Sequence, residues 1–183
     1  DEVMTGFGRT GTLFACEQAG VVPDIACYAK GLTGGALPLA VTMCKREIFE
    51  AHLSPERARA FFHSSSYTAN PIACAAALAN LDVWAAGEPA VRVAALCDMQ
   101  ATRIARFTDD ARFSNARQLG IITALDLNIA DGGYLATIAL DLMRYFNARG
   151  LVLRPLGPTI YVFPPYCVEA AELDLVYDAI SEA

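Results

Sequence analysis

Two short apolar runs, each next to a glycine-rich loop, constrain the fold most strongly. Residues 25–29 (IACYA) lead directly into the loop 30–35 (KGLTGG), and residues 37–44 (LPLAVTMC) form the second run. Short apolar runs bounded by Gly, Pro and Asp are typical of strands that are buried on both faces. We therefore expect an α/β fold in the N-terminal part of this 183-residue chain.

The clearest helix signal is the dipeptide Asn70-Pro71. Asn is a favoured N-cap and Pro is tolerated in the first helical turn, so an Ala-rich helix is predicted from here to about Trp84. Residues 87–89 (GEP) interrupt it, and a second long helix is predicted beyond them.

We place a domain boundary at this interruption, with residues 1–86 in one domain and residues 87–183 in the other. Near the C-terminus, Leu173, Tyr177 and Ile180 share one helical face, which predicts a helix packed on a core. The other predicted elements are helices at 46–52 and 134–149 and strands at 120–128, 151–153 and 159–163.

The composition excludes several classes of protein. Apolar residues make up 55% of the chain and the net charge is −6, which argues against disorder and against a surface for nucleic acid or anionic lipid. No apolar stretch is long enough to span a membrane. The chain begins with Asp1 rather than Met and shows no targeting segment, so we expect a cytoplasmic protein and a piece of a longer chain.

The six cysteines and two histidines show no metal-binding pattern. There is no Cys-x-x-Cys pair, and neither His52 nor His63 has a partner at the spacing that zinc requires. We therefore predict no metal site, and six buried thiols in a reducing compartment.

Lysine is scarce, and one lysine is placed unusually. It occurs only at positions 30 and 45, whereas the other basic residues are arginine. Lys30 follows a predicted strand and precedes a Gly-rich loop, where partial desolvation would favour a neutral, nucleophilic amine suited to Schiff-base chemistry. A lysine that simply extends into solvent from the sheet edge is an equally good interpretation.

Four other features each have two interpretations. Asp1 could hold a cationic ring nitrogen or be a solvated acid, and residues 64–68 (SSSYT) could bind an anion or cap the next helix. Arg154 could clamp a carboxylate or be a surface charge. Residues 6–11 (GFGRTG) match a dinucleotide-binding pattern, but no acidic residue ends the following strand, so a tight turn is the better interpretation.

Taken together, three motifs resemble class III pyridoxal-phosphate aminotransferases in content, order and spacing. They are residues 1–11 (DEVMTGFGRTG), 29–35 (AKGLTGG) and 63–77 (HSSSYTANPIACAAA), and the resemblance runs to about residue 85. It implies a fold type I architecture: part of the large mixed-sheet cofactor domain, plus a small α+β C-terminal domain. Residues 153–157 (LRPLG), with Tyr161 and the Pro-Pro pair that follows, are similar to the branch of the family that acts in biotin biosynthesis.

The resemblance implies pyridoxal 5′-phosphate as cofactor and a role for three residues. Lys30 would bind the cofactor covalently and then move a proton during the reaction. Asp1 would pair with the pyridinium nitrogen. Ser66, where the family usually has Thr, would bind the cofactor phosphate of the neighbouring subunit in a homodimer.

The substrate residues are implied in the same way. Arg154 would hold the carboxylate of the keto acceptor, 8-amino-7-oxononanoate, Tyr161 would line that pocket, and Arg9 would lie near it. The amino donor would be S-adenosylmethionine or lysine, in a ping-pong reaction. Another omega-aminotransferase of the family and a non-catalytic interaction module remain alternatives. Because the family's enzymes are more than twice as long, we expect this chain to be inactive alone.

Overall fold

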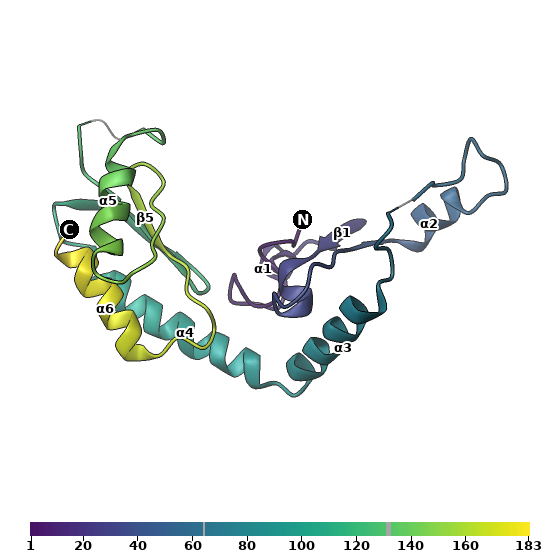
Figure 1. Ribbon diagram of the computed structural model, residues 1–183, viewed down its shortest axis with the longest axis horizontal. Helices are drawn as coiled ribbons and strands as arrows, with labels where there is room; N and C mark the ends of the chain where they lie inside the picture. Colours follow the sequence, from purple (N-terminus) through teal and green to yellow (C-terminus); the bar gives the residue numbers. More distant parts are fainter. Residues whose placement is uncertain (64, 131–132) are drawn as a thin grey trace. The chain divides into compact units, whose positions relative to one another are not determined.

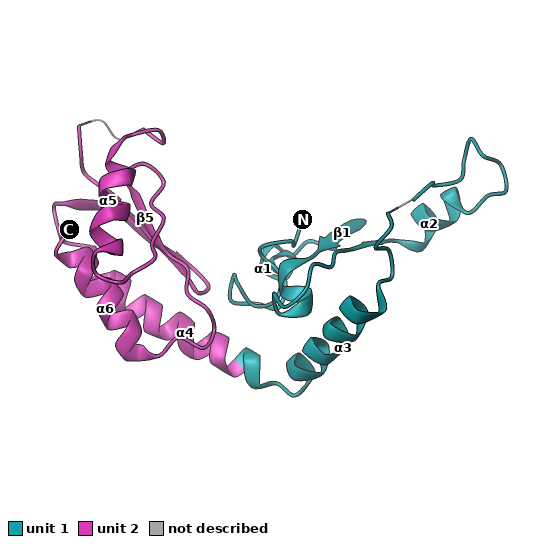
Figure 2. Ribbon diagram, viewed as in Figure 1, with its two compact units in different colours: residues 1–90 teal, residues 91–183 magenta. Residues whose placement is uncertain are grey.

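The computed structural model describes residues 1–63, 65–130 and 133–183. These residues form two compact units, 1–90 and 91–183, coloured separately in Figure 2. Across the described residues, no helix has both the length and the apolar character needed to cross a membrane.

Unit 1 is built around a short antiparallel pair of strands and one long helix (Figure 1). Strand β1 pairs with β2 so that Ile25 is opposite Cys44, and a parallel bridge joins Glu2 to Tyr28 at the other end of β1. The elements of the unit are α1 (Ala15–Ala19), β1 (Ile25–Tyr28), the 3-10 turn η1 (Lys30–Thr33), β2 (Val41–Cys44), α2 (Arg46–His52) and α3 (Pro71–Ala85).

The two predicted strands are present but shorter than expected, and the expectation that both faces are buried is wrong for this chain. Every residue of β2 is exposed, including Met43 at 60%, and in β1 only Ala26 is buried. A two-stranded ribbon leaves both faces open unless other elements pack on them. The described residues of unit 1 do not supply that cover for β2.

The core of unit 1 joins the Gly-rich N-terminal segment to α3. Phe7, Leu32 and Ala77 are buried together, and Trp84 packs against them from α3. The rings of Phe7 and Trp84 make an edge contact with centroids 6.1 Å apart. Because α3 contributes both Ala77 and Trp84, it fixes the loop that follows β1.

Helix α3 begins where the sequence predicted. The Asn70 side-chain oxygen accepts hydrogen bonds from the backbone N–H groups of Ile72, at 3.0 Å, and Ala73, at 3.5 Å. Pro71 occupies the first turn, where its missing N–H costs nothing. The cap confirms the predicted start and sets the direction in which residues 65–69 approach the helix.

Within its described residues, unit 2 combines an antiparallel three-stranded sheet, in the order β3-β4-β5, with three α-helices and one 3-10 turn. The α+β pattern predicted for this part of the chain is therefore present. Its elements are α4 (Glu88–Ile104), which begins at the end of unit 1, the 3-10 turn η2 (Ala105–Phe107), β3 (Phe113–Leu119), β4 (Ile122–Leu127), α5 (Ile138–Asn147), β5 (Thr159–Val162) and α6 (Ala170–Ser181).

In unit 2, one strand was not predicted and one predicted strand is absent. Residues 113–119 (FSNARQL) form β3 but were not predicted as a strand. Because β3 is an edge strand whose mostly polar residues face solvent, its sequence carries no clear apolar pattern. Residues 151–153 were predicted as a strand but adopt no regular structure. Instead, the Leu151 N–H donates to the Phe146 carbonyl at 3.0 Å, so this residue completes the end of α5 after Gly150.

A buried polar network ties the helices of unit 2 to its sheet. The hydroxyl of Tyr177 donates to Gln100 Oε1 at 2.5 Å and lies 2.6 Å from Thr123 Oγ1. Gln100 in turn donates to the Ile121 carbonyl at 2.7 Å. Burial raises the pKa of Tyr177 to about 12, despite the opposing effects of the Thr123 hydrogen bond and the Arg103 charge. The network therefore holds a neutral phenol.

The prediction of six buried thiols is wrong. All six cysteines are free, Cys44 and Cys167 are exposed, and the other four are only partly buried. Cys44 is exposed because it belongs to the uncovered strand β2. Apolar flanking sequence indicated burial here, but burial also needs a second layer over the strand.

Candidate active site

Lys30 is the first residue of η1, and Ala29 alone separates it from the end of β1. The loop around it is fixed by backbone hydrogen bonds: Leu32 N–H donates to the Ala29 carbonyl at 2.5 Å, and Gly35 N–H donates to the Lys30 carbonyl at 3.0 Å. The Lys30 side chain is exposed, so the described residues of unit 1 do not enclose it in the apolar wall that the sequence suggested.

Lys30 lines an open hollow of about 830 Å³ in unit 1. Three stretches of chain meet there: the N-terminal segment, the loop between the two strands, and the segment that precedes α3. Its lining residues are Val3, Ala29, Lys30, Gly35, Leu37, Pro38, Leu39, Ala40, His63, Ser65, Tyr67, Thr68 and Ala69. The hollow thus combines one primary amine with hydroxyl groups, an imidazole and an apolar side.

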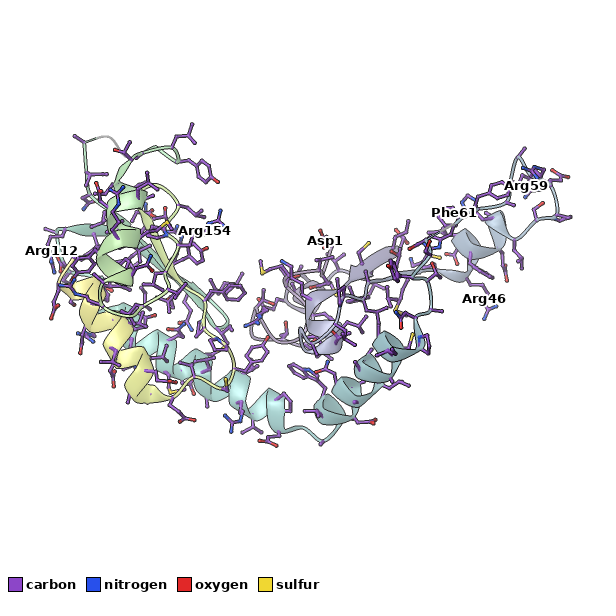
Figure 3. All side chains as sticks on the ribbon, viewed as in Figure 1. Asp1, Arg46, Arg59, Phe61, Arg112 and Arg154 are labelled. Atoms are coloured by element: carbon purple, nitrogen blue, oxygen red, sulfur yellow. The ribbon has the colours of Figure 1, made fainter. Side chains whose placement is uncertain are left out.

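Asp1, which is labelled in Figure 3, lies on the N-terminal segment that is bridged to β1. Its Oδ1 accepts a hydrogen bond from the Val3 N–H at 2.8 Å, and the residue is exposed. The following Glu2 N–H donates to the Cys27 carbonyl at 2.8 Å, in a parallel arrangement. The segment that carries Asp1 and the strand that leads to Lys30 are therefore neighbours.

Glu2 is an anchor that the sequence reasoning missed. Only 6% of it is exposed, and its carboxylate accepts hydrogen bonds from the Thr5 hydroxyl and from the Cys16 N–H, the latter at 2.8 Å. Burial alone would raise the pKa of Glu2, but these hydrogen bonds outweigh it and leave the pKa below its usual value. A charged Glu2 therefore fixes the turn beside Asp1.

The glycine motif at residues 6–11 forms a tight turn. Gly8 and Gly11 have φ angles of 89° and 98°, and the Gly11 N–H donates to the Gly8 carbonyl at 3.0 Å. The next helix, α1, has only five residues. This geometry agrees with the tight-turn interpretation and not with a dinucleotide fingerprint, which opens a long helix. Arg9 lies within the turn and is half-buried.

Ser66 lies in the exposed turn that precedes α3. Its neighbours Ser65, Tyr67 and Thr68 line the hollow, and Thr68 Oγ1 is 3.2 Å from His63 Nδ1. Part of the predicted anion-binding stretch, Ser64, lies outside the described residues. The structure therefore brings the hydroxyl-rich segment and Lys30 to the same hollow.

Asn80 is a second residue that the sequence reasoning missed. It lies on α3, and its Nδ2 donates to the carbonyls of Gly31, at 2.9 Å, and Leu32, at 3.1 Å. Its sequence signal was available: Asn80 occupies the same helical stripe as Ala73, Ala77 and Trp84, where an apolar residue is expected. An amide in such a stripe indicates a specific hydrogen-bond partner.

Arg154 and Tyr161 belong to unit 2. Arg154 is exposed on the segment that leads into β5, as Figure 3 shows. A tight hairpin follows it, in which Leu156 and Thr159 exchange backbone hydrogen bonds of 2.9 and 3.1 Å. Tyr161 lies on β5, half-buried and opposite Ala124.

The hairpin after Arg154 is anchored by Asp126 on β4. Asp126 Oδ1 accepts from the Thr159 hydroxyl at 2.7 Å, and Oδ2 accepts from Asn115 at 3.0 Å and from Arg117 at 3.2 Å. Burial alone would raise the pKa of Asp126, but the three donors together lower it. A charged Asp126 thus joins the hairpin to β3 and β4.

The chemistry of unit 1 follows from these groups. No cluster of three or more His, Cys, Asp or Glu side chains that could hold a metal ion occurs within the described residues. The hollow offers instead a lysine amine on a fixed loop and hydroxyls before a helix N-terminus, and the Asp1 carboxylate lies on the segment bridged to β1, outside the lining residues. These groups suit an enzyme that attaches a phosphorylated aldehyde cofactor to lysine.

Comparison with known proteins agrees with this class. All of residues 1–183 match the family described as "Aminotransferase class-III". The chain belongs to the class-III aminotransferase family, whose members use pyridoxal phosphate.

Within the family, several curated relatives share a single description. An adenosylmethionine-8-amino-7-oxononanoate aminotransferase of Synechococcus elongatus is 44% identical over 182 residues, which cover 100% of this chain and 42% of that protein. The protein of that name from Aquifex aeolicus is 36% identical, with 100% and 42% covered. An omega-aminotransferase of Caulobacter vibrioides is 33% identical, with 98% and 41% covered.

Solved structures show the same fold. An (S)-enantioselective omega-transaminase from Thermomicrobium roseum superposes with a TM-score of 0.87 at 32% identity, covering 100% of this chain and 41% of that one. An adenosylmethionine-8-amino-7-oxononanoate aminotransferase from Methanocaldococcus jannaschii has the same TM-score at 30% identity, covering 100% and 45%. The chain spans about two fifths of the length of the curated relatives it matches.

Proposed function

We propose that these residues are part of an aminotransferase that moves an amino group onto 8-amino-7-oxononanoate in biotin biosynthesis. The observation that supports this most directly is Lys30, held on a fixed loop at a hollow that it shares with the hydroxyl-rich segment. The names of the relatives from Synechococcus elongatus and Aquifex aeolicus support the substrate. Those proteins are longer, so the activity is proposed for the full-length protein and not for residues 1–183 alone.

The groups around the hollow fit pyridoxal phosphate. When bound, this cofactor supplies an aldehyde for covalent attachment and a ring that withdraws electrons from the substrate. We assign the attachment to the Lys30 amine, which also moves the proton at the substrate carbon. Asp1 would pair by charge with the ring nitrogen, from the segment bridged to β1. Ser66 would supply a hydroxyl for the phosphate of the cofactor bound to the neighbouring subunit.

The acceptor is recognised through unit 2 in this proposal. Arg154 is exposed on a segment that the Asp126–Thr159 hydrogen bond fixes, which suits a guanidinium that binds a carboxylate with two N–H groups. Tyr161 lines the acceptor pocket and Arg9 lies near the substrate. The donor is S-adenosylmethionine or lysine, and the two substrates occupy the site in turn.

The finer architecture is part of the same proposal. Residues 1–86 would complete one part of a large cofactor domain of the fold type I class, and residues 87–183 would form most of its small C-terminal domain. The full-length protein would be a homodimer, because Ser66 would act on the cofactor of the neighbouring subunit. We also propose that it is cytoplasmic.

A second function within the family is an omega-aminotransferase with another acceptor. The Caulobacter vibrioides relative and the Thermomicrobium roseum structure both have that description. The two functions differ in the acceptor. Amination of 8-amino-7-oxononanoate by the full-length protein, with little activity on simple ketones, would support the first. The reverse preference would support the second.

The experiment that tests the cofactor role uses absorbance. Pyridoxal phosphate added to the full-length protein should give a band that disappears after borohydride reduction, and Lys30→Ala should abolish the band. The matched control is Lys45→Ala. Lys45 Nζ is 2.5 Å from Asp24 in an ion pair at the far end of the strands, so its loss should leave the band intact. A band that is absent, or that depends on Lys45 instead, would favour a non-catalytic module.

A further inference from the structure

Helix α3 holds the loop that carries Lys30, and Asn80 makes the contact. The carboxamide Nδ2 of Asn80 lies 2.9 Å from the Gly31 carbonyl and 3.1 Å from the Leu32 carbonyl, so one side chain spans two successive peptide groups after Lys30. In Figure 1, α3 runs beside this loop. From this geometry we propose that Asn80 is a positioning residue for the Lys30 amine.

One of the two Asn80 hydrogen bonds supplies a donor that the loop does not provide internally. In η1 the Gly31 carbonyl also accepts from the Gly34 N–H at 3.0 Å, but the short 3-10 turn leaves the Leu32 carbonyl for an outside donor. Asn80 is half-buried, where an unpaired carbonyl is costly. Its amide therefore fixes the orientation of the Gly31 and Leu32 carbonyls, in the loop that continues directly from Lys30.

The loop that carries Lys30 is closely packed on both sides, so it has little room to move relative to α3. An added Cβ at Gly31 would lie 2.7 Å from Phe7, and one at Gly34 would lie 3.1 Å from Asn80 Oδ1. Leu32 is buried against Ala77, one turn before Asn80 on the same helix. The loop is thus held between Phe7 on one side and α3 on the other, with Asn80 as its polar contact.

This arrangement couples two parts of the proposed site. The N-cap of α3, Asn70, ends the segment of residues 65–69 that lines the hollow, and Asn80 holds the Lys30 loop from the same helix. The helix between them holds the backbone of the Lys30 loop and the start of the segment 65–69 in one arrangement. Displacement of a reacting group by about 1 Å can cost on the order of a hundredfold in rate, so the position of the Lys30 loop matters for catalysis.

The test compares Asn80→Asp and Asn80→Leu in the full-length protein. Asn80→Asp keeps the size of the side chain but places an acceptor against two carbonyls, and Asn80→Leu keeps the volume without a donor. Both should lower kcat by about tenfold or more, with a smaller change in KM. Both should also shift the pH midpoint of the Lys30-dependent absorbance band. The matched control is Asp82→Leu, at an exposed position on the same helix.

A second readout does not need the cofactor. In the cofactor-free protein, amide hydrogen exchange at residues 30–35 should speed up in both Asn80 variants and stay unchanged in Asp82→Leu. If exchange, pH midpoint and kcat match those of the wild type, or if the variants only lower the melting temperature, Asn80 is not a positioning residue. The proposal rests on the proposed function, but the two fail differently. A wild-type protein without a Lys30-dependent band would overturn the cofactor role, whereas the exchange measurement would still test the loop contact.

Discussion

At the scale of single residues, the site depends on a position where only glycine fits. Gly31 follows Lys30, and a Cβ there would lie 2.7 Å from the Phe7 ring. Such a separation is too short for real atoms, so the ring or the loop would have to move. Gly31 is therefore required by the close approach of the Lys30 loop to the core of unit 1.

We expect Gly31→Ala to destabilise the protein by about 1–3 kcal/mol, the usual cost of overpacking a core. Thermal or denaturant unfolding measures the effect. Gly133→Ala is the control, because a Cβ at Gly133 meets no atom within 4 Å. Equal stability of the two variants would mean that the loop adapts without strain.

Asp126 provides a pH-dependent prediction. Its pKa is lowered in the folded state, so its contribution to stability is complete above the pKa of an unfolded Asp, about 3.9, and disappears as the pH falls through the lower folded value. Asp126→Asn should therefore reduce the free energy of unfolding at pH 7 and have little effect at strongly acidic pH.

Denaturant unfolding at both pH values checks the Asp126 prediction. Asp141→Asn serves as the control, because Asp141 pairs with Arg144 on an exposed helical surface, where such a pair adds little stability. A pH-independent loss in Asp126→Asn would show that its role does not depend on charge.

At the scale of elements, unit 2 is held together by a polar network inside an apolar core. Tyr177 on α6 contacts Gln100 on α4 and Thr123 on β4, and all three are fully buried. The sequence predicted Tyr177 as part of the apolar face of its helix, and it is buried as expected. Its hydroxyl also joins two helices to the sheet, which the helical periodicity alone did not indicate.

Tyr177→Phe should cost about 1–3 kcal/mol at neutral pH, because it leaves Gln100 and Thr123 short of a partner. With a folded pKa of about 12 for Tyr177, the unfolded chain releases this proton first, so wild-type stability should fall as the pH rises from about 10 to 12. Tyr177→Phe should lose that part of the alkaline dependence.

Unfolding at pH 7 and in alkaline buffer measures both effects. Tyr134→Phe is the control, because Tyr134 is 72% exposed and should change little. If Tyr177→Phe is as stable as the wild type at pH 7, the network adds nothing beyond packing.

At the scale of the whole molecule, unit 1 exposes apolar side chains along its strands. Ile25 is 53% exposed and Met43 60% exposed, although the sequence predicted both strands to be buried. The chain spans about two fifths of the length of its curated relatives. Exposed apolar strands favour association.

We expect the 183-residue chain to self-associate at micromolar concentration. Sedimentation velocity should show species larger than 19.6 kDa. Met43→Lys should reduce association, because it places a charge on the exposed strand β2. Thr102→Lys, at an exposed position on α4, adds the same charge elsewhere and should have no such effect. A monomeric wild-type chain would contradict the prediction.

The sequence by itself determined the local structure and the chemical groups. The Asn70-Pro71 start of α3, helix α2 and the apolar face of α6 all agree with prediction, because caps, turns and periodicity act between residues close in sequence. The motifs around Asp1, Lys30 and residues 63–77 identified the family, which the match over residues 1–183 confirms.

The tertiary structure alone decided which groups meet. The Asp126–Thr159 hydrogen bond and the Asn80 hydrogen bonds join residues far apart in sequence, so no local pattern specifies them. Exposure behaves in the same way: the apolar residues of β2, Cys44 among them, remain uncovered because burial requires a second layer, which is a property of the assembled fold. The sequence placed Lys30 after a strand, and the packing of α3 fixed the position of the loop that carries this lysine.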